Sequence, residues 1–123
     1  EDDIDCAIAG IPAAEFGELT CYHASARALA LAAAENITPE RISVALTPVS
    51  PLALRPKIAR ERRFIFGALA DRFVPPGQVD TLWRHWEQPE IEWYPGGHLG
   101  FRFHRSVTTF VDRALRATIL QPR

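Results

Sequence analysis

The sequence predicts an α/β fold with about three parallel strands flanked by helices. Three short runs rich in apolar residues, at about 4–11, 63–70 and 90–94, have the length and composition of strands. The central run is apolar almost throughout, which is typical of a strand buried on both faces of a parallel sheet. Apolar residues at helical spacing fill much of the remaining chain. We therefore expect one domain over residues 1–123.

Helices are expected between the first strand and the central strand. Residues 13–16 suit one helical turn, which Gly17 is expected to interrupt. Residues 18–35 are rich in alanine and leucine, and both are strong helix formers. They therefore predict one helix, with Asn36 as its stop.

A second helix signal follows directly. Thr38 is placed to cap a helix that starts at Pro39, because proline lacks the N–H that the first turn leaves unpaired. This helix is expected to run to about Leu46, and residues 47–51 form a proline-broken turn. The mostly basic lead at 56–63 could be an anion site, but a solvated connector is the favoured interpretation.

After the central strand the signals alternate between helix and strand. A helix is predicted before Pro89, and a terminal helix from about Arg105. The apolar face of the first is formed by Val79, Leu82, Trp83 and Trp86, and that of the second by Val107, Phe110, Val111, Leu115 and Ile119. We expect the tryptophans to pack in the core rather than to form an aromatic binding face.

Two polar side chains stand where parallel strands are expected to end. Asp71 follows the central strand, and His98 follows the third strand after Gly96 and Gly97, which are expected to give a tight turn. Ligand sites in open α/β sheets lie at these strand ends, so the two side chains can meet there. A carboxylate can hold an imidazole in one tautomer and stabilise its charged form, as a general base requires. The alternative is that Asp71 caps a helix and His98 is an ordinary loop histidine.

The same stretch resembles the C-terminal part of an α/β-hydrolase. Residues 67–76, Gly-Ala-Leu-Ala-Asp-Arg-Phe-Val-Pro-Pro, resemble the loop that carries the family's catalytic acid, and residues 93–98, Trp-Tyr-Pro-Gly-Gly-His, resemble its histidine loop. The opening, residues 6–12, is similar to the preceding strand of that fold. In this family the nucleophile, the acid and the histidine follow in that chain order. The resemblance implies that Asp71 and His98 are catalytic, with Asp71 orienting His98 and His98 acting as the general base.

One element of the family does not occur in this sequence. No Gly-x-Ser-x-Gly is found in the 123 residues. The resemblance therefore implies that the nucleophile and the oxyanion hole lie upstream of Glu1, and that the chain is the C-terminal portion of a longer protein. Ser25 is the alternative nucleophile, but His23 and Arg27 stand where the elbow needs small residues. Alone, the chain is expected to be inactive or nearly so.

The resemblance also implies a substrate and partners. The expected function is hydrolysis of a small-molecule ester or thioester by a serine-type acyl-transfer mechanism. Residues 13–60 would form a helical cap, and the alternative is that their helices simply pack on the sheet. The bare edge of the first strand would pair with the N-terminal half of the parent or with a second copy. The alternative functions are a noncatalytic member of the fold that binds a ligand or partner, and an independent interaction domain.

Composition argues against several other classes. A formal net charge of -1 disfavours nonspecific nucleic-acid binding. The histidines lack metal-ligand spacing, so we expect no metal site. We also expect no cofactor, and we expect His85 and His104 to lie at the surface. Cys6 and Cys21 are too few for a disulfide framework, although a single bridge is an alternative. Because no run of about 20 apolar residues and no leader pattern occurs, we expect no membrane span and a cytoplasmic location.

Overall fold

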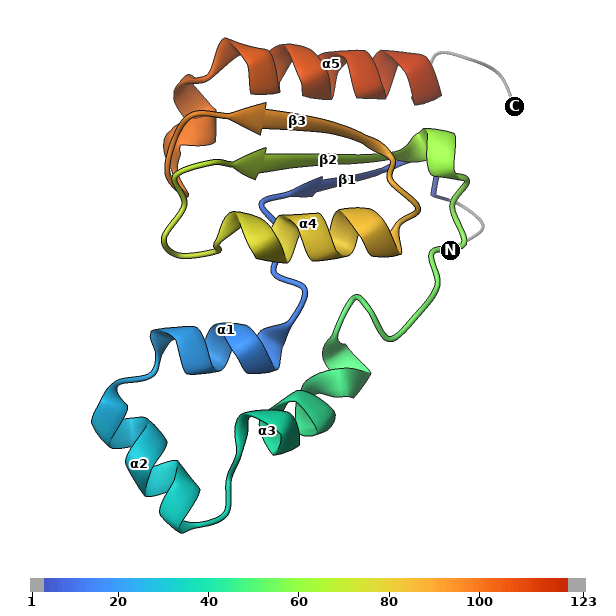
Figure 1. Cartoon of the computed structure of the whole chain (residues 1–123). Coiled ribbons are helices and arrows are strands. Elements are labelled where there is room, and N and C mark those ends of the chain that lie inside the picture. The colour runs from blue at the N-terminus through green and yellow to red at the C-terminus, as the bar shows by residue number, and fades with distance from the viewer. Residues whose placement is uncertain (1–3, 120–123) are drawn as a thin grey trace.

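A three-stranded parallel sheet forms the centre of the computed structural model, which describes residues 4–119 (Figure 1). The strands β1 (Ala7–Gly10), β2 (Arg63–Ala68) and β3 (Glu90–Tyr94) lie in the order β1-β2-β3. Helices α4 (Pro76–His85) and α5 (Arg105–Ile119) lie on opposite sides of this sheet. The predicted α/β fold with three parallel strands is confirmed.

The central strand β2 is buried on both faces because its successive side chains point to opposite sides of the sheet. Phe64 points towards α5, where its ring meets the ring of Phe110 edge-on at a centroid distance of 6.0 Å. Ile65 is fully buried on the other side, in the core cluster that also contains Val79 and Leu82 of α4. This double burial explains why the run is apolar almost throughout.

The first strand is shorter than predicted. It ends at Gly10, since Ile11 has a φ of 48° and turns the chain out of the extended conformation. The N–H of Ile11 still donates to the carbonyl oxygen of Phe66 at 2.8 Å, so the pairing with β2 continues to the turn. Ile11 is buried, which fits a positive φ that surrounding packing holds in place.

The segment between β1 and β2 contains three helices, α1 (Phe16–His23), α2 (Ala26–Ala34) and α3 (Pro39–Leu46), and then the 3₁₀ turn η1 (Thr47–Val49). The prediction of one helix over residues 18–35 is wrong. Ala24 adopts an extended conformation, and Ser25 caps α2 by accepting a hydrogen bond from the N–H of Ala28. Local capping thus divides a run whose composition alone favours continuous helix.

The sequence suggested that Gly17 interrupts a helix. Instead, Gly17 lies inside α1 and is buried. A β-carbon at this position would lie 2.0 Å from Oγ of Ser43 and 2.7 Å from Cα of the same residue. The glycine is therefore required because α1 and α3 pack with their backbones close together.

These three helices form an arm that lies away from the sheet (Figure 1). The alternative that they pack on the sheet does not describe the structure, and α2 buries none of its residues. The buried side chain of Gln78, on α4, ties down the start of the arm. Its Oε1 accepts from the N–H groups of Ala14 and Glu15 at 3.1 and 2.8 Å, and its Nε2 donates to Glu18 at 3.0 Å.

Part of the basic segment before β2 is structural rather than solvated. Arg63 follows the 3₁₀ turn η2 (Arg60–Arg62) and is only 5% exposed. Its guanidinium donates to the carbonyl oxygens of Ile58 and Trp86, at 2.8 and 2.6 Å, and to the carboxylate of Glu87 at 2.9 Å. The interpretation as a solvated connector is therefore wrong for Arg63, which joins the start of β2 to the end of α4.

Replacing Arg63 with leucine is expected to lower the free energy of unfolding by about 3 kcal/mol, because three acceptors lose a buried charged donor. Thermal unfolding followed by circular dichroism measures the loss. The matched control is Arg60→Leu, whose side chain is 53% exposed and pairs with Glu61 in solvent. Equal melting temperatures for the two variants would contradict the structural role of Arg63.

The last elements lead to the carboxyl end of the sheet. A 3₁₀ turn, η3 (Gly100–Phe103), precedes α5, which begins at Arg105 as predicted. The prediction that the tryptophans belong to the core is confirmed, because all three are partly buried and pack against the main core cluster: Trp83, Trp86 and Trp93.

Candidate active site

Asp71 and His98 lie at the carboxyl end of the sheet and form a hydrogen bond. Nδ1 of His98 lies 2.8 Å from Oδ2 of Asp71. The carboxylate side chain is fully buried, whereas the imidazole is 36% exposed. Because an ionised carboxylate only accepts hydrogen bonds, this contact places the ring proton of a neutral His98 on Nδ1. The prediction that the two side chains meet is confirmed.

The acid is held by its own loop. Oδ1 of Asp71 accepts from the N–H groups of Phe73 and Val74 at 2.7 and 2.9 Å, which leaves Oδ2 for the histidine. Asp71 does not cap α4, since the N-cap position of that helix is Pro75. The alternative of a plain helix cap is thus wrong, and both carboxylate oxygens have defined partners.

The two loops meet because β2 and β3 are adjacent and parallel, so their carboxyl ends lie at one edge. Their backbones stay paired beyond the strands. The N–H of Leu69 donates to the carbonyl oxygen of Tyr94 at 3.0 Å, and the N–H of Ala70 donates to that of Gly96 at 3.1 Å. The loop that carries Asp71 and the loop that carries His98 are therefore held together where they leave the strands.

The two ring nitrogens of His98 have different surroundings. Its ring packs against Phe73 at a centroid distance of 4.9 Å, with 60° between the planes. Within residues 4–119 no hydrogen bond involves Nε2 of His98, while Nδ1 is occupied by Asp71. An Nε2 without a hydrogen-bond partner in that range, on an imidazole that is 36% exposed, can accept a proton from a reacting hydroxyl group.

His23 is a neighbour of the site that the sequence did not identify. Its Nε2 lies 2.7 Å from the carbonyl oxygen of Phe73, and the two rings lie 5.3 Å apart. The end of α1 thus contacts the residue that packs on His98. The two residues are fifty positions apart, and no local pattern signals such a contact.

The expected tight turn is present, since the N–H of Gly96 donates to the carbonyl oxygen of Tyr94 at 3.0 Å, but glycine is needed at position 96 for close packing. Neither Gly96 nor Gly97 has a positive φ, so the loop does not use the conformational freedom of glycine. A β-carbon on Gly96 would instead lie 2.8 Å from the ring of Tyr94, which is fully buried.

Burial raises the pKa of Tyr94, a backbone hydrogen bond from Phe101 lowers it, and the charge of Asp71 raises it further. The phenol is therefore neutral and a hydrogen-bond donor at ordinary pH.

Ser25 does not join this site. Its Oγ accepts from the N–H of Ala28 at 3.2 Å, and no hydrogen bond links it to His98 in the described part of the chain. Ser25→Ala is expected to lower the free energy of unfolding by about 1 kcal/mol through loss of the helix cap. Ser106→Ala, at an exposed position in α5, is the control in thermal unfolding. A variant as stable as the control would contradict the capping role.

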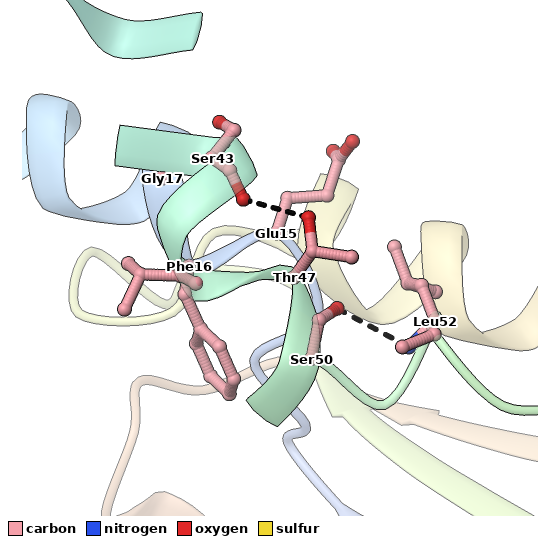
Figure 2. Close-up of a pocket in the computed structure, with 9 residues that line it drawn as sticks. Glu15, Phe16, Gly17, Ser43, Thr47, Ser50 and Leu52 are labelled. Carbon is pink, nitrogen blue, oxygen red and sulfur yellow. Dashed lines mark hydrogen bonds between the residues drawn. The ribbon is translucent and has the colours of Figure 1, made fainter. Parts of the chain in front are cut away.

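A separate pocket of about 200 Å³ lies on the arm between α1 and α3 (Figure 2). The hydroxyl groups of Thr47 and Ser50, which line it, form hydrogen bonds with backbone groups. Oγ1 of Thr47 donates to the carbonyl oxygen of Ser43 at 2.9 Å, and Ser50 binds the backbone of Ala14 and Leu52. A hydrogen bond with Glu18, assisted by burial and by the charge of Glu18, raises the pKa of Glu15 at the rim. Neither Asp71 nor His98 lines this pocket.

The remaining histidines and cysteines have ordinary surroundings. His85 is partly buried, with Nε2 2.9 Å from the carbonyl oxygen of Leu54. His104 was expected at the surface but is only partly exposed, because its ring packs on Tyr94 at a centroid distance of 4.8 Å. Cys6 and Cys21 are free thiols, so the alternative of a bridge is wrong.

Neither a membrane segment nor a metal cluster is found between residues 4 and 119. In that range, no helix combines the length and apolar character needed to cross a membrane. No group of three or more histidine, cysteine, aspartate or glutamate side chains there is placed to hold a metal ion.

Comparison with known proteins gives relatives without a described function. The chain is 41% identical over 121 residues to the uncharacterized proteins MT2702 and Rv2627c of Mycobacterium tuberculosis, from strains CDC 1551 and H37Rv. The match covers 94% of this chain and 27% of each relative, so the chain spans about a quarter of the length of the curated relatives it matches. No family model and no solved structure matches the chain.

Proposed function

We propose that the chain supplies the acid and the base of a serine-type acyl-transfer site, as the C-terminal part of an α/β-hydrolase fold domain. The observation that carries the proposal is the 2.8 Å contact between Asp71 and His98 at the carboxyl ends of two adjacent parallel strands. The buried acid is fixed by two amides of its own loop, and the imidazole of His98 is 36% exposed. This arrangement suits a general base better than a structural ion pair.

The chemistry follows from the two nitrogens of His98. Nε2 removes the proton from a serine hydroxyl as the serine oxygen attacks the carbonyl carbon of an ester or thioester. The resulting imidazolium, stabilised by ionised Asp71, gives that proton to the departing alcohol or thiol. Water then repeats the same steps on the acyl-serine, releasing the acid and restoring neutral His98.

The nucleophile is proposed to lie on a segment that precedes this chain in the parent protein. The relatives are longer than the matched part, which covers 27% of their length, so sequences of this kind occur within longer proteins. In addition, β1 is the edge strand of the described sheet, and a further strand can pair with its free side. The arm of α1 to α3 would then cover the substrate pocket beside Asp71 and His98. His23 would be the contact of this arm with the loop that carries Asp71.

Fluorophosphonate labelling tests this function. The 123-residue chain and a longer product that includes the preceding coding sequence are each treated with the probe, and intact mass and peptide mapping locate the adduct. We expect one adduct on a serine outside residues 1–123 in the longer product, and none on the short chain. An adduct on Ser25 would overturn the placement of the nucleophile. A longer product without any adduct would instead favour the noncatalytic alternative, a member of the fold that binds a ligand or partner.

A further inference from the structure

The loop that carries His98 folds around one side chain, that of Tyr94. This tyrosine is the last residue of β3 and is fully buried. Its hydroxyl donates to the carbonyl oxygen of Gly97, the residue before His98, at 2.8 Å. The hydrogen bond fixes the peptide group from which the histidine projects.

The two glycines that flank this loop are explained by the same ring. A β-carbon on Gly96 would lie 2.8 Å from Cε2 of Tyr94, and one on Gly100 would lie 3.2 Å from the same atom. The first distance is shorter than real side chains allow, so the loop follows the ring too closely for any residue except glycine at position 96. His104 closes the loop by packing its ring on Tyr94 at 4.8 Å.

The main chain of Tyr94 also reaches the acid loop. Its carbonyl oxygen accepts hydrogen bonds from the N–H of Gly96 and from the N–H of Leu69, both at 3.0 Å. Leu69 stands two residues before Asp71. The backbone of one residue thus joins the two loops, while its side chain shapes the loop that holds the base.

We propose that Tyr94 is the positioning residue of the Asp71–His98 pair, the template that holds the imidazole with Nδ1 against the carboxylate. Its catalytic meaning rests on the proposed function, but the geometry can be measured without any substrate. Without the hydroxyl, the Gly97 peptide can rotate and His98 samples orientations in which Nδ1 leaves Asp71. The imidazole then loses the partner that enforces the Nδ1–H tautomer.

The tautomer of neutral His98 is the direct readout, measured in the 123-residue chain by nitrogen NMR at a pH where the ring is uncharged. We expect Tyr94→Phe to lower the ratio of Nδ1–H to Nε2–H about fivefold, the effect of one lost hydrogen bond. Tyr22→Phe is the matched control, because it removes the chain's other phenolic hydroxyl from an exposed position. His85 serves as the internal reference in each spectrum.

The glycines give a second, independent test. Gly96→Ala is expected to shift the same tautomer ratio at least as strongly, whereas Gly77→Ala, with nothing within 4 Å of the added carbon, should leave it unchanged. Should Tyr94→Phe fail to fold, Gly100→Ala decides, since its methyl group meets the ring at 3.2 Å and a two- to threefold shift is expected. An unchanged ratio in folded Tyr94→Phe, even with a lower melting temperature, would overturn the proposal.

An activity measurement separates this inference from the function on which it rests. In the longer product, Tyr94→Phe should leave KM unchanged and lower kcat for ester hydrolysis by the factor by which the Nδ1–H fraction of neutral His98 falls, at most about fivefold. A tautomer shift in Tyr94→Phe, together with a longer product that fluorophosphonate does not label, would support the positioning role of Tyr94 and overturn the acyl-transfer function. Labelling of the wild type with no tautomer shift in the variant would do the reverse.

Discussion

His98→Gln is expected to lower the rate of serine acylation by about 10⁴-fold or more in the longer product that carries the nucleophile. Glutamine can still hydrogen-bond to Asp71, but its amide cannot accept a proton at any ordinary pH. The serine would therefore keep its proton during attack, and the leaving group would lack an acid. The pseudo-first-order rate of fluorophosphonate labelling and the hydrolysis of a p-nitrophenyl ester both measure the loss.

The control for this variant is His85→Gln, on α4. His85 is also a histidine whose ring nitrogen hydrogen-bonds to a backbone carbonyl, and in the described residues its partner in that bond, Leu54, lies outside the loop that carries Asp71. Its labelling rate should equal that of the wild type. If His98→Gln is labelled as fast as this control, His98 is not the base, and its pairing with Asp71 is structural.

The order of elements around this site was predictable because it depends on local pattern and on one rule of sheet geometry. An apolar run followed by Asp71, a helix, a second strand and then His98 places both side chains after parallel strands. Parallel strands share one carboxyl edge, so the two side chains could meet there, and the resemblance of the two loops to those of α/β-hydrolases favoured that pairing over a plain helix cap. The structure confirms the meeting of Asp71 and His98 at 2.8 Å.

The features that sequence reasoning missed depend on distant contacts. The guanidinium of Arg63 reaches Trp86 and Glu87, more than twenty positions away, and a charged residue in a basic segment gives no sign of burial. The contact of His23 with Phe73 spans fifty positions. Residue type and spacing constrain neighbours within a few turns, whereas such contacts exist only once the chain is folded.

The glycines near His98 show a different kind of limit. The tight turn was predicted, but not why it needs glycine, since glycine can serve either a positive φ or a close approach. In the sequence the two reasons look identical. The close approach at Gly96 requires knowing that Tyr94 turns its ring beneath the loop, and only the structure shows this. A break such as the one at Ser25 is similar, because a capping serine competes with strong helix propensity on both sides.

Asp71→Asn is expected to lower the acylation rate by about 10³–10⁴-fold while leaving the fold intact. Asparagine retains a carbonyl oxygen that can accept from the N–H groups of Phe73 and Val74, so the acid loop keeps its own hydrogen bonds. The amide nitrogen then faces His98 as a donor. It can pair with Nδ1 only if that atom carries no proton, and the neutral ring is driven to the Nε2–H tautomer.

This reversal disables the base, because Nε2 then holds a proton where it must accept one. It also predicts a result in the 123-residue chain alone: nitrogen NMR should show the dominant tautomer of His98 inverted relative to the wild type. Asp80→Asn is the matched control, since Asp80 pairs only with Arg84 on the surface of α4 among the interactions described, and should leave the tautomer unchanged. An inverted tautomer with full labelling activity would mean that His98 is positioned by Asp71 without serving as the base. An uninverted tautomer would mean that the 2.8 Å contact does not control the ring, and the proposed mechanism would fail at its first step.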